Sequence, residues 1–169
     1  MEFKVGDKVV YPNHGVGIIE RIQSRVTSGE EQTFYMLRII STDSTVMVPV
    51  SNTGMVGLRK VLSKVEIDRV FKVLKNEKVE VFDDWKGRFQ ENSERMRTGE
   101  IARVADVLKG LTHLSQVKAL SYRERKMLDR ARFLVVSEIA EASHLSPEKV
   151  EQQIDEALAL SLKGKTTDH

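Results

Sequence analysis

Apolar and polar residues follow two different periods along the chain, and the period changes near residue 62. Before that point, short runs rich in valine, isoleucine and aromatic residues alternate with turn-forming residues, which is typical of β-strands. The glycines of YPNHGVG are expected to supply positive φ angles, and TSGEEQ and STDS are expected to be turns. The predicted strands cover residues 7–12, 16–23, 33–40 and 45–50, with a possible fifth at 55–61.

From Ser63 onward, apolar residues recur about every 3.6 positions, which indicates amphipathic helices. Ser63 with Glu66, and Ser121 with Glu124, have the spacing of a capping box. About five helices with short joints predict a compact bundle. The expected fold class is therefore α+β: a small SH3/Tudor-like β-barrel over residues 1–62, followed by a C-terminal compact helical bundle of about five helices over residues 63–169.

Composition limits the function classes. The chain has no cysteine, which excludes disulfides, zinc-thiolate sites and thiol catalysis. No run approaches the roughly 18 apolar residues of a membrane span, and the N-terminus lacks the pattern of a signal peptide. We therefore expect a cytoplasmic protein without membrane contact. A net charge of +2 is too small to indicate nucleic-acid binding by itself.

Enzymatic motifs are missing from the sequence. It contains no Walker loop, no dinucleotide-binding glycine fingerprint, no His-Glu-x-x-His and no Gly-x-Ser-x-Gly. The four histidines are scattered, and acidic residues alternate with basic ones along the predicted helices, as on a solvated face. We therefore predict no catalytic residue, metal, cofactor or small-molecule substrate. An enzyme with an unrecognised site would need a deep pocket with perturbed acids or histidines, and the sequence nominates none.

The only tryptophan, Trp85, lies among charged residues in FDDWKGRF. On the predicted helix it shares a face with Phe89 and Met96. One interpretation is a core stripe, because a buried indole contributes a large apolar area. The other is an exposed indole that stacks on a base or enters a minor groove, while Lys86 and Arg88 meet phosphates. The residues alone leave both interpretations open.

A second basic group lies in SYRERKMLDRAR. Arg123, Lys126 and Arg130 fall within roughly 60° of one another on a helical wheel, and Arg125 lies on another flank. Neighbouring acids dilute this charge, so a solvated face and a phosphate-binding face are equally compatible with it. Residues 138–154 have a helix-turn-helix pattern, but their second helix is acidic and would repel DNA phosphates.

Five segments occur in this order: MEFKVGDKVVYPNHGVGIIERI, TVMVPV, DDWKGRF, TGEIARVADVLKGL and LSYRERKMLDRAR. Together they closely resemble the CarD/CdnL family of bacterial RNA polymerase-binding transcription regulators, over essentially the whole chain. The resemblance implies that the barrel binds the β-subunit lobe of RNA polymerase by strand addition. It also implies that the helical domain contacts promoter DNA just upstream of the −10 element, where the tryptophan wedges into the minor groove.

The resemblance also implies site residues. In the barrel, Arg25, Met47 and Pro49 match positions that bind RNA polymerase, and Pro49 suits an edge strand because it has no N–H to donate. Gly87 and Gln90 stand where some relatives carry basic residues, which leaves fewer phosphate contacts near the tryptophan. The candidate DNA-binding residues are Trp85, Lys86, Arg88, Arg123, Arg125, Lys126 and Arg130.

The expected function is therefore regulation of transcription without catalysis. A monomer tethered to the polymerase would stabilise the open promoter complex, because tethering raises the effective concentration of weak DNA contacts. The alternative is a protein-interaction adaptor for the polymerase or for repair machinery, without direct DNA contact. In that alternative the helices only pack against one another, and Trp85 lies in the core.

Overall fold

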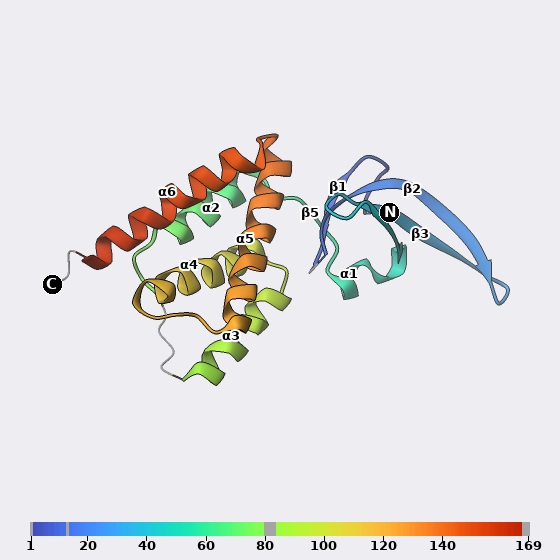
Figure 1. Ribbon diagram of the computed structural model, residues 1–169. Helices are drawn as coiled ribbons and strands as arrows, with labels where there is room; N and C mark the ends of the chain where they lie inside the picture. Colours follow the sequence, from blue (N-terminus) through green and yellow to red (C-terminus); the bar gives the residue numbers. More distant parts are fainter. Residues whose placement is uncertain (1, 13, 80–83, 167–169) are drawn as a thin grey trace. The chain divides into compact units, whose positions relative to one another are not determined.

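The computed structural model describes residues 2–12, 14–79 and 84–166. The chain forms two compact units, Met1–Val61 and Leu62–His169, and each is described by itself (Figure 1). The expected fold class is confirmed: an antiparallel sheet precedes a helical bundle.

The first unit is a five-stranded antiparallel sheet in the order β4-β3-β2-β1-β5. Apolar side chains on one face of β2, β3 and β4 form its core, with Ile19, Leu37 and Val48 fully or almost fully buried. The distal parts of β2 and β3 extend past the other strands as a long hairpin (Figure 1). The strands are β1 (Lys8–Tyr11), β2 (Gly15–Thr27), β3 (Glu30–Ile39), β4 (Ser44–Pro49) and β5 (Arg59–Lys60).

The turn predicted for TSGEEQ is wrong in extent. Only Ser28 and Gly29 form the turn, and Thr27 already pairs with Glu30 across it. Both turn residues have positive φ, 54° and 82°, as the tightest hairpin connections require. The other polar residues of TSGEEQ continue the two strands. Polar residues are compatible with strands here because this end of the hairpin is exposed and buries no core side chains.

The strand expected over residues 55–61 is mostly wrong. A 3₁₀ turn, η1 (Val50–Asn52), leads into a short helix, α1 (Thr53–Val56). Gly57, with a φ of 74°, ends this helix in the left-handed conformation. The strand that follows, β5, has two residues, and it pairs with β1.

The glycines of YPNHGVG divide into two roles, so the expectation of positive φ holds for one of the two. Gly15 has a φ of 103° at the start of β2. Gly17 lies in the strand without a positive φ, and a Cβ added there would lie 3.2 Å from the carbonyl oxygen of Arg38. Gly17 therefore serves the close approach of two strands, and not a turn.

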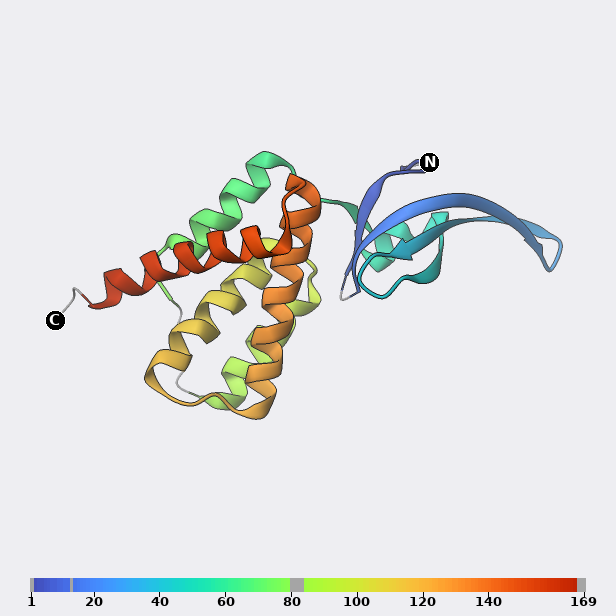
Figure 2. The same ribbon diagram turned by 45° about the horizontal axis from the view of Figure 1, so that its top comes forward.

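The second unit is a bundle of five helices. The long central helix α4 contacts each of the other four (Figure 2). Leu74, Val104, Leu108, Val135 and Ile154 are buried together in its core. The helices are α2 (Lys64–Lys75), α3 (Trp85–Arg97), α4 (Ile101–Val117), α5 (Tyr122–Ser143) and α6 (Pro147–Thr166).

Helix starts follow the predicted caps. The Ser63 hydroxyl accepts the Glu66 N–H while the Glu66 carboxylate accepts the Ser63 N–H, at 3.3 and 3.1 Å. The Ser121 hydroxyl accepts the Glu124 N–H at 3.2 Å. In each case the side chain supplies an acceptor for an N–H that the helix itself cannot bond.

Candidate functional site

Strand β4 lies at one edge of the sheet, and its side chains alternate between the two faces. Val48 is buried in the core and Val46 packs against it. Met47 points away from the core and is 40% exposed. Met47 is therefore not a core residue, and the edge of β4 presents backbone groups of the kind that bind a further strand.

The strand register brings the candidate polymerase-binding residues onto one face. Met47 lies opposite Met36, and Pro49 lies opposite Phe34. On β2, Arg25 shares this face, although it lies in the distal part of the hairpin, beyond the last pair with β4. We call this the outer sheet face, made of Arg21, Gln23, Arg25, Phe34, Met36, Met47 and Pro49.

Phe34 and Met36 are not among the residues identified from the sequence, although they separate Met47 and Pro49 from β2. The alternation of TFYMLRII contains the signal, because Tyr35 and Leu37 are the inward set and their neighbours must face outward. The sequence does not show which residues of β3 lie opposite those of β4. It therefore could not place Phe34 and Met36 next to Met47 and Pro49.

In the second unit, Trp85 begins helix α3. The carboxylate of Asp84 caps this helix by accepting the N–H groups of Lys86 and Gly87, both at 3.3 Å. The indole stacks on Phe89, with ring centroids 5.5 Å apart and planes inclined by 13°. Its Nε1–H donates to the hydroxyl of Ser121 at 3.4 Å. Trp85 is 37% exposed, so it lies at the surface on an aromatic support and not in the bundle core.

The location of Arg88 contradicts its assignment as a DNA contact. The side chain is buried, and its guanidinium makes a two-point ion pair with Glu124 of α5. Nε donates to one carboxylate oxygen at 2.7 Å and Nη2 donates to the other at 3.2 Å. A helical wheel of α3 alone places Arg88 beside Trp85, but it does not show an acid 36 positions further along. Arg88 holds two helices together.

Glu124 is the other half of this pair and is 2% exposed. Burial by itself would raise the pKa of its carboxyl group. The hydrogen bond and positive charge of Arg88, with hydrogen bonds from Ser121, outweigh burial and hold the pKa below its ordinary value. The carboxylate is therefore charged at neutral pH and fixes the start of α5 against the start of α3.

Aromatic rings lie next to three predicted cations of α5, one across the junction with α3 and two within α5 itself. The guanidinium of Arg123 lies over the ring of Phe89, at 5.6 Å. Along α5, the Lys126 ammonium lies 5.0 Å from the Tyr122 ring, and the Arg130 guanidinium lies 5.4 Å from the Phe133 ring. We call this the aromatic–basic surface, made of Trp85, Phe89, Tyr122, Arg123, Lys126, Arg130 and Phe133. Lys86 follows Trp85 in the first turn of α3 and is exposed, but it makes no ring contact of this kind among the described residues.

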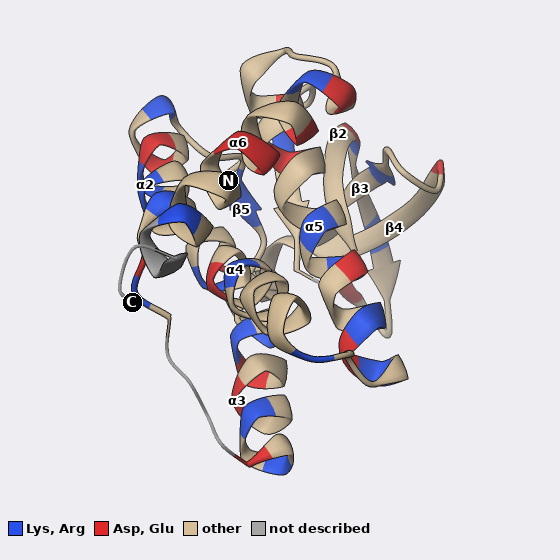
Figure 3. Cartoon of the chain, turned by 60° about the vertical axis from the view of Figure 1, so that its left-hand side comes forward, with Lys and Arg blue, Asp and Glu red and all other residues tan. Residues whose placement is uncertain are grey.

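Arg125 is not brought into this group. It lines a separate depression with Lys118 and Leu120, beside the connection between α4 and α5. Acidic residues are interspersed with the basic ones along both α3 and α5 (Figure 3). Neither helix therefore carries an uninterrupted run of positive charge.

The aromatic members Phe89, Tyr122 and Phe133 are not among the predicted site residues. Two of the pairs have a sequence signal, because Tyr122 and Lys126 lie four positions apart and Arg130 and Phe133 lie three apart on one helix. The contact of Arg123 with Phe89 joins two helices and has no such signal.

Over the described ranges, no group of three or more His, Asp or Glu side chains is placed to hold a metal ion. Within the same ranges, no helix is long and apolar enough to cross a membrane. The arrangement of the two surfaces provides groups for binding: a strand edge with apolar side chains on one unit, and stacked rings with cations on the other.

Two family profiles match the chain. Residues 3–62 match the CarD-like/TRCF RID domain, and residues 69–155 match the CarD C-terminal domain. YdeB of Bacillus subtilis, a protein named as a transcription factor, is 34% identical over 137 residues, which cover 81% of this chain and 90% of YdeB. The matches define a transcription factor associated with RNA polymerase. The chain belongs to the CarD/CdnL family of bacterial RNA polymerase-binding transcription regulators.

Two solved structures from Myxococcus xanthus are also similar. The 72-residue N-terminal domain of CarD, solved by NMR, is 39% identical and covers 36% of this chain and 81% of that chain, with a TM-score of 0.31. CdnLNt is 42% identical and covers 38% of this chain and 90% of that chain, with a TM-score of 0.33.

Proposed function

We propose that the chain binds the RNA polymerase β subunit through the edge of β4 and the outer sheet face. We further propose that its aromatic–basic surface binds promoter DNA upstream of the −10 element and stabilises the open complex. The observation that carries this proposal is the position of Trp85, which is 37% exposed and stacked on Phe89, over whose ring the Arg123 guanidinium lies.

A supported indole suits a distorted duplex edge. Base stacking on an aromatic side chain contributes about 1–3 kcal/mol. Trp85 is held on two sides, by the ring of Phe89 and by the hydroxyl of Ser121, so little side-chain entropy is lost when a base or a groove meets it. Because an intact duplex offers no such contact, the interaction favours melted DNA over closed DNA.

The cations of this surface supply phosphate contacts, but they are few. With a net charge of +2 for the chain, binding to free DNA should be weak. A tether to the polymerase removes this limit, because it raises the local concentration of the surface at the promoter. The edge of β4 suits such a tether, since main-chain hydrogen bonds supply affinity and Met47 supplies an apolar contact.

The test is the lifetime of open complexes formed with Trp85→Ala. Loss of about 1–3 kcal/mol should shorten that lifetime roughly 5- to 150-fold, while binding of the variant to polymerase stays unchanged. Val117→Ala removes another exposed apolar side chain of the same unit and should leave the lifetime unchanged. An unaltered lifetime for Trp85→Ala would exclude the proposed wedge.

The adaptor alternative required Trp85 to lie in the core. The exposed indole does not meet that requirement. An adaptor would also give promoter complexes whose stability is indifferent to the cations of α5, and that outcome would favour it over DNA binding.

A further inference from the structure

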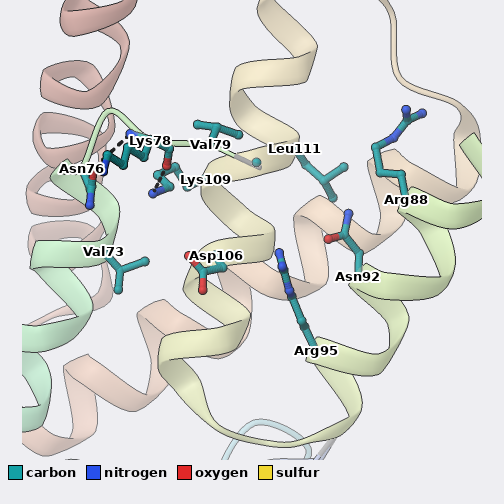
Figure 4. A pocket seen from close by; sticks show the side chains of 11 residues that line it. Val73, Asn76, Lys78, Val79, Arg88, Asn92, Arg95, Asp106, Lys109 and Leu111 are labelled. Carbon is teal, nitrogen blue, oxygen red and sulfur yellow. Dashed lines mark hydrogen bonds between the residues drawn. The ribbon is translucent and has the colours of Figure 1, made fainter. Parts of the chain in front are cut away.

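The helical unit contains a pocket that lies apart from the exposed ring of Trp85. Its volume is about 530 Å³, within the range of small-molecule sites. Among the described residues, the end of α2, the segment Lys78–Val79, one face of α3 and one face of α4 surround it (Figure 4). Neither proposed surface uses this space, and Arg88, which lines it, belongs to neither surface.

Asn92 lies one turn after Arg88 and its side chain points toward the pocket (Figure 4). It is 6% exposed. Among the residues that the structure describes, none makes a hydrogen bond to its amide group. An amide has two N–H donors and an acceptor, and at the pocket wall these groups are open to a polar molecule in the pocket. A polar molecule in the pocket would satisfy them.

Lys109 comes from the opposite wall, on α4, and is 5% exposed. Its Nζ donates to the carbonyl oxygen of Lys78 at 2.9 Å. An ammonium group has three donors, and one carbonyl satisfies one of them. Burial lowers the pKa of Lys109, and the negative charge of Asp106 opposes this effect. A buried cation with so few partners is stabilised by an anion.

We propose that this pocket binds a small organic anion, whose carboxylate or phosphate group accepts hydrogen bonds from the Lys109 ammonium and the Asn92 amide. Arg95 is a further cationic residue of the lining, and Val73 and Leu111 supply an apolar wall for the body of the ligand. A ligand site here requires neither the polymerase contact nor the DNA contact proposed above.

Gly110 offers a way to close the pocket. It lies on α4 beside Lys109 and lines the space, and a Cβ added there would meet no atom within 4 Å. A larger side chain at this position can therefore enter the pocket without a clash at its Cβ. Glycine within a helix is also unfavourable relative to other residues, by roughly 1 kcal/mol against alanine, so substitution need not weaken α4.

The experiment measures binding of citrate, inorganic phosphate and adenosine monophosphate to the full chain, by titration calorimetry and amide chemical shifts at constant ionic strength. The three probes separate a carboxylate ligand, a free phosphate and a phosphate ester. We expect saturable binding of at least one probe, with shifts in α3 and α4. Asn92→Ala should weaken that binding about tenfold, and Gly110→Leu should abolish it.

Gly54→Leu is the matched control, since Gly54 is another glycine with open space around its Cβ but lies in the first unit. It should leave binding unchanged. Thermal unfolding of each variant verifies that the bundle is intact, and Asn92→Ala provides the test if Gly110→Leu does not fold. No saturable binding of any probe would overturn the proposal. Equal binding by wild type, Asn92→Ala and Gly110→Leu would also overturn it.

Discussion

The outer sheet face and the aromatic–basic surface offer opposite kinds of contact. The first is an edge strand whose backbone is available, with Met47 as its most prominent apolar side chain. The second consists of rings and cations on two helices. Backbone pairing depends little on salt, whereas phosphate contacts weaken steeply as salt rises. The two contacts can therefore be separated experimentally by ionic strength.

The two surfaces also differ in how they are assembled. The outer sheet face comes from neighbouring antiparallel strands, so its register follows from the hairpins themselves. The aromatic–basic surface depends on the Arg88–Glu124 pair, which joins residues 36 positions apart. This buried pair, together with the Trp85–Ser121 hydrogen bond, therefore fixes the start of α3 against the start of α5.

The largest expected effect is on stability. Arg88→Ala leaves Glu124 buried without its partner, which typically costs about 3–5 kcal/mol. Urea unfolding followed by Trp85 fluorescence, which reports the helical unit, should show this loss, while amide protection of the sheet is retained. As a control, Arg132→Ala breaks partly exposed ion pairs with Glu151 and Asp155 and should cost about 1 kcal/mol or less for each pair. A loss of that smaller size for Arg88→Ala would contradict a structural role.

Acid should act on the same junction with a smaller effect, because a protonated Glu124 still forms hydrogen bonds. Since the folded-state pKa of Glu124 is lowered, its stabilising contribution is complete above the unfolded value of about 4.3. The contribution is lost as pH falls through the lower, folded value. Unfolding free energies of wild type and Glu124→Gln, measured against pH, should begin to approach each other as pH falls below about 4.3 and should meet only below the folded-state pKa of Glu124. A constant difference down to the lowest pH would contradict the assignment.

On the sheet, Met47→Glu should weaken capture by the polymerase β subunit about tenfold or more, because it puts an unpaired charge beside the edge strand. Val26→Glu is the control, since Val26 is an exposed apolar residue on the other face of β2. Quantitative pull-down at two salt concentrations measures the effect. Equal loss from both substitutions would indicate a general charge effect and not a contact at Met47.

The smallest effect concerns a single phosphate contact. Lys126→Ala should lower the slope of log affinity against log salt by about one, in promoter binding by the polymerase-tethered protein. Arg103→Ala removes an exposed cation of α4 that is paired with Glu100, and it should leave the slope unchanged. An unchanged slope for Lys126→Ala would exclude that residue from the phosphate contacts.

Periodicity predicts the elements of this chain well where side chains of one kind share a face. The change of period near residue 62 and the caps at Ser63 and Ser121 identify the helices, because caps and periods are local. The prediction for the hairpin end at 27–32 is wrong in extent because both faces of the hairpin are exposed there. No alternation of apolar residues therefore distinguishes strand from turn. The helical turn of α1 carries no period long enough to detect.

The candidate site can be predicted from the sequence only where its residues lie on the same helix. Trp85, Lys126 and Arg130 each have a signal within their own helix, and all three are exposed in the structure. Arg88 has the same local signal, yet it is buried, because its partner lies on another helix. The pocket beside Asn92 has no signal at all, since its walls come from separate parts of the chain.

The packing of α2 against α6 also bears on synthesis by the ribosome. All strands of the sheet lie within the first 61 residues, so that unit can fold as soon as it has left the exit tunnel. Helix α2 follows directly, but it packs against both α4 and α6 (Pro147–Thr166). The part of its apolar side that α6 covers stays exposed until translation has passed most of the remaining chain. A nascent chain held by its folded sheet would therefore expose an unpartnered helix, which is a surface for chaperones.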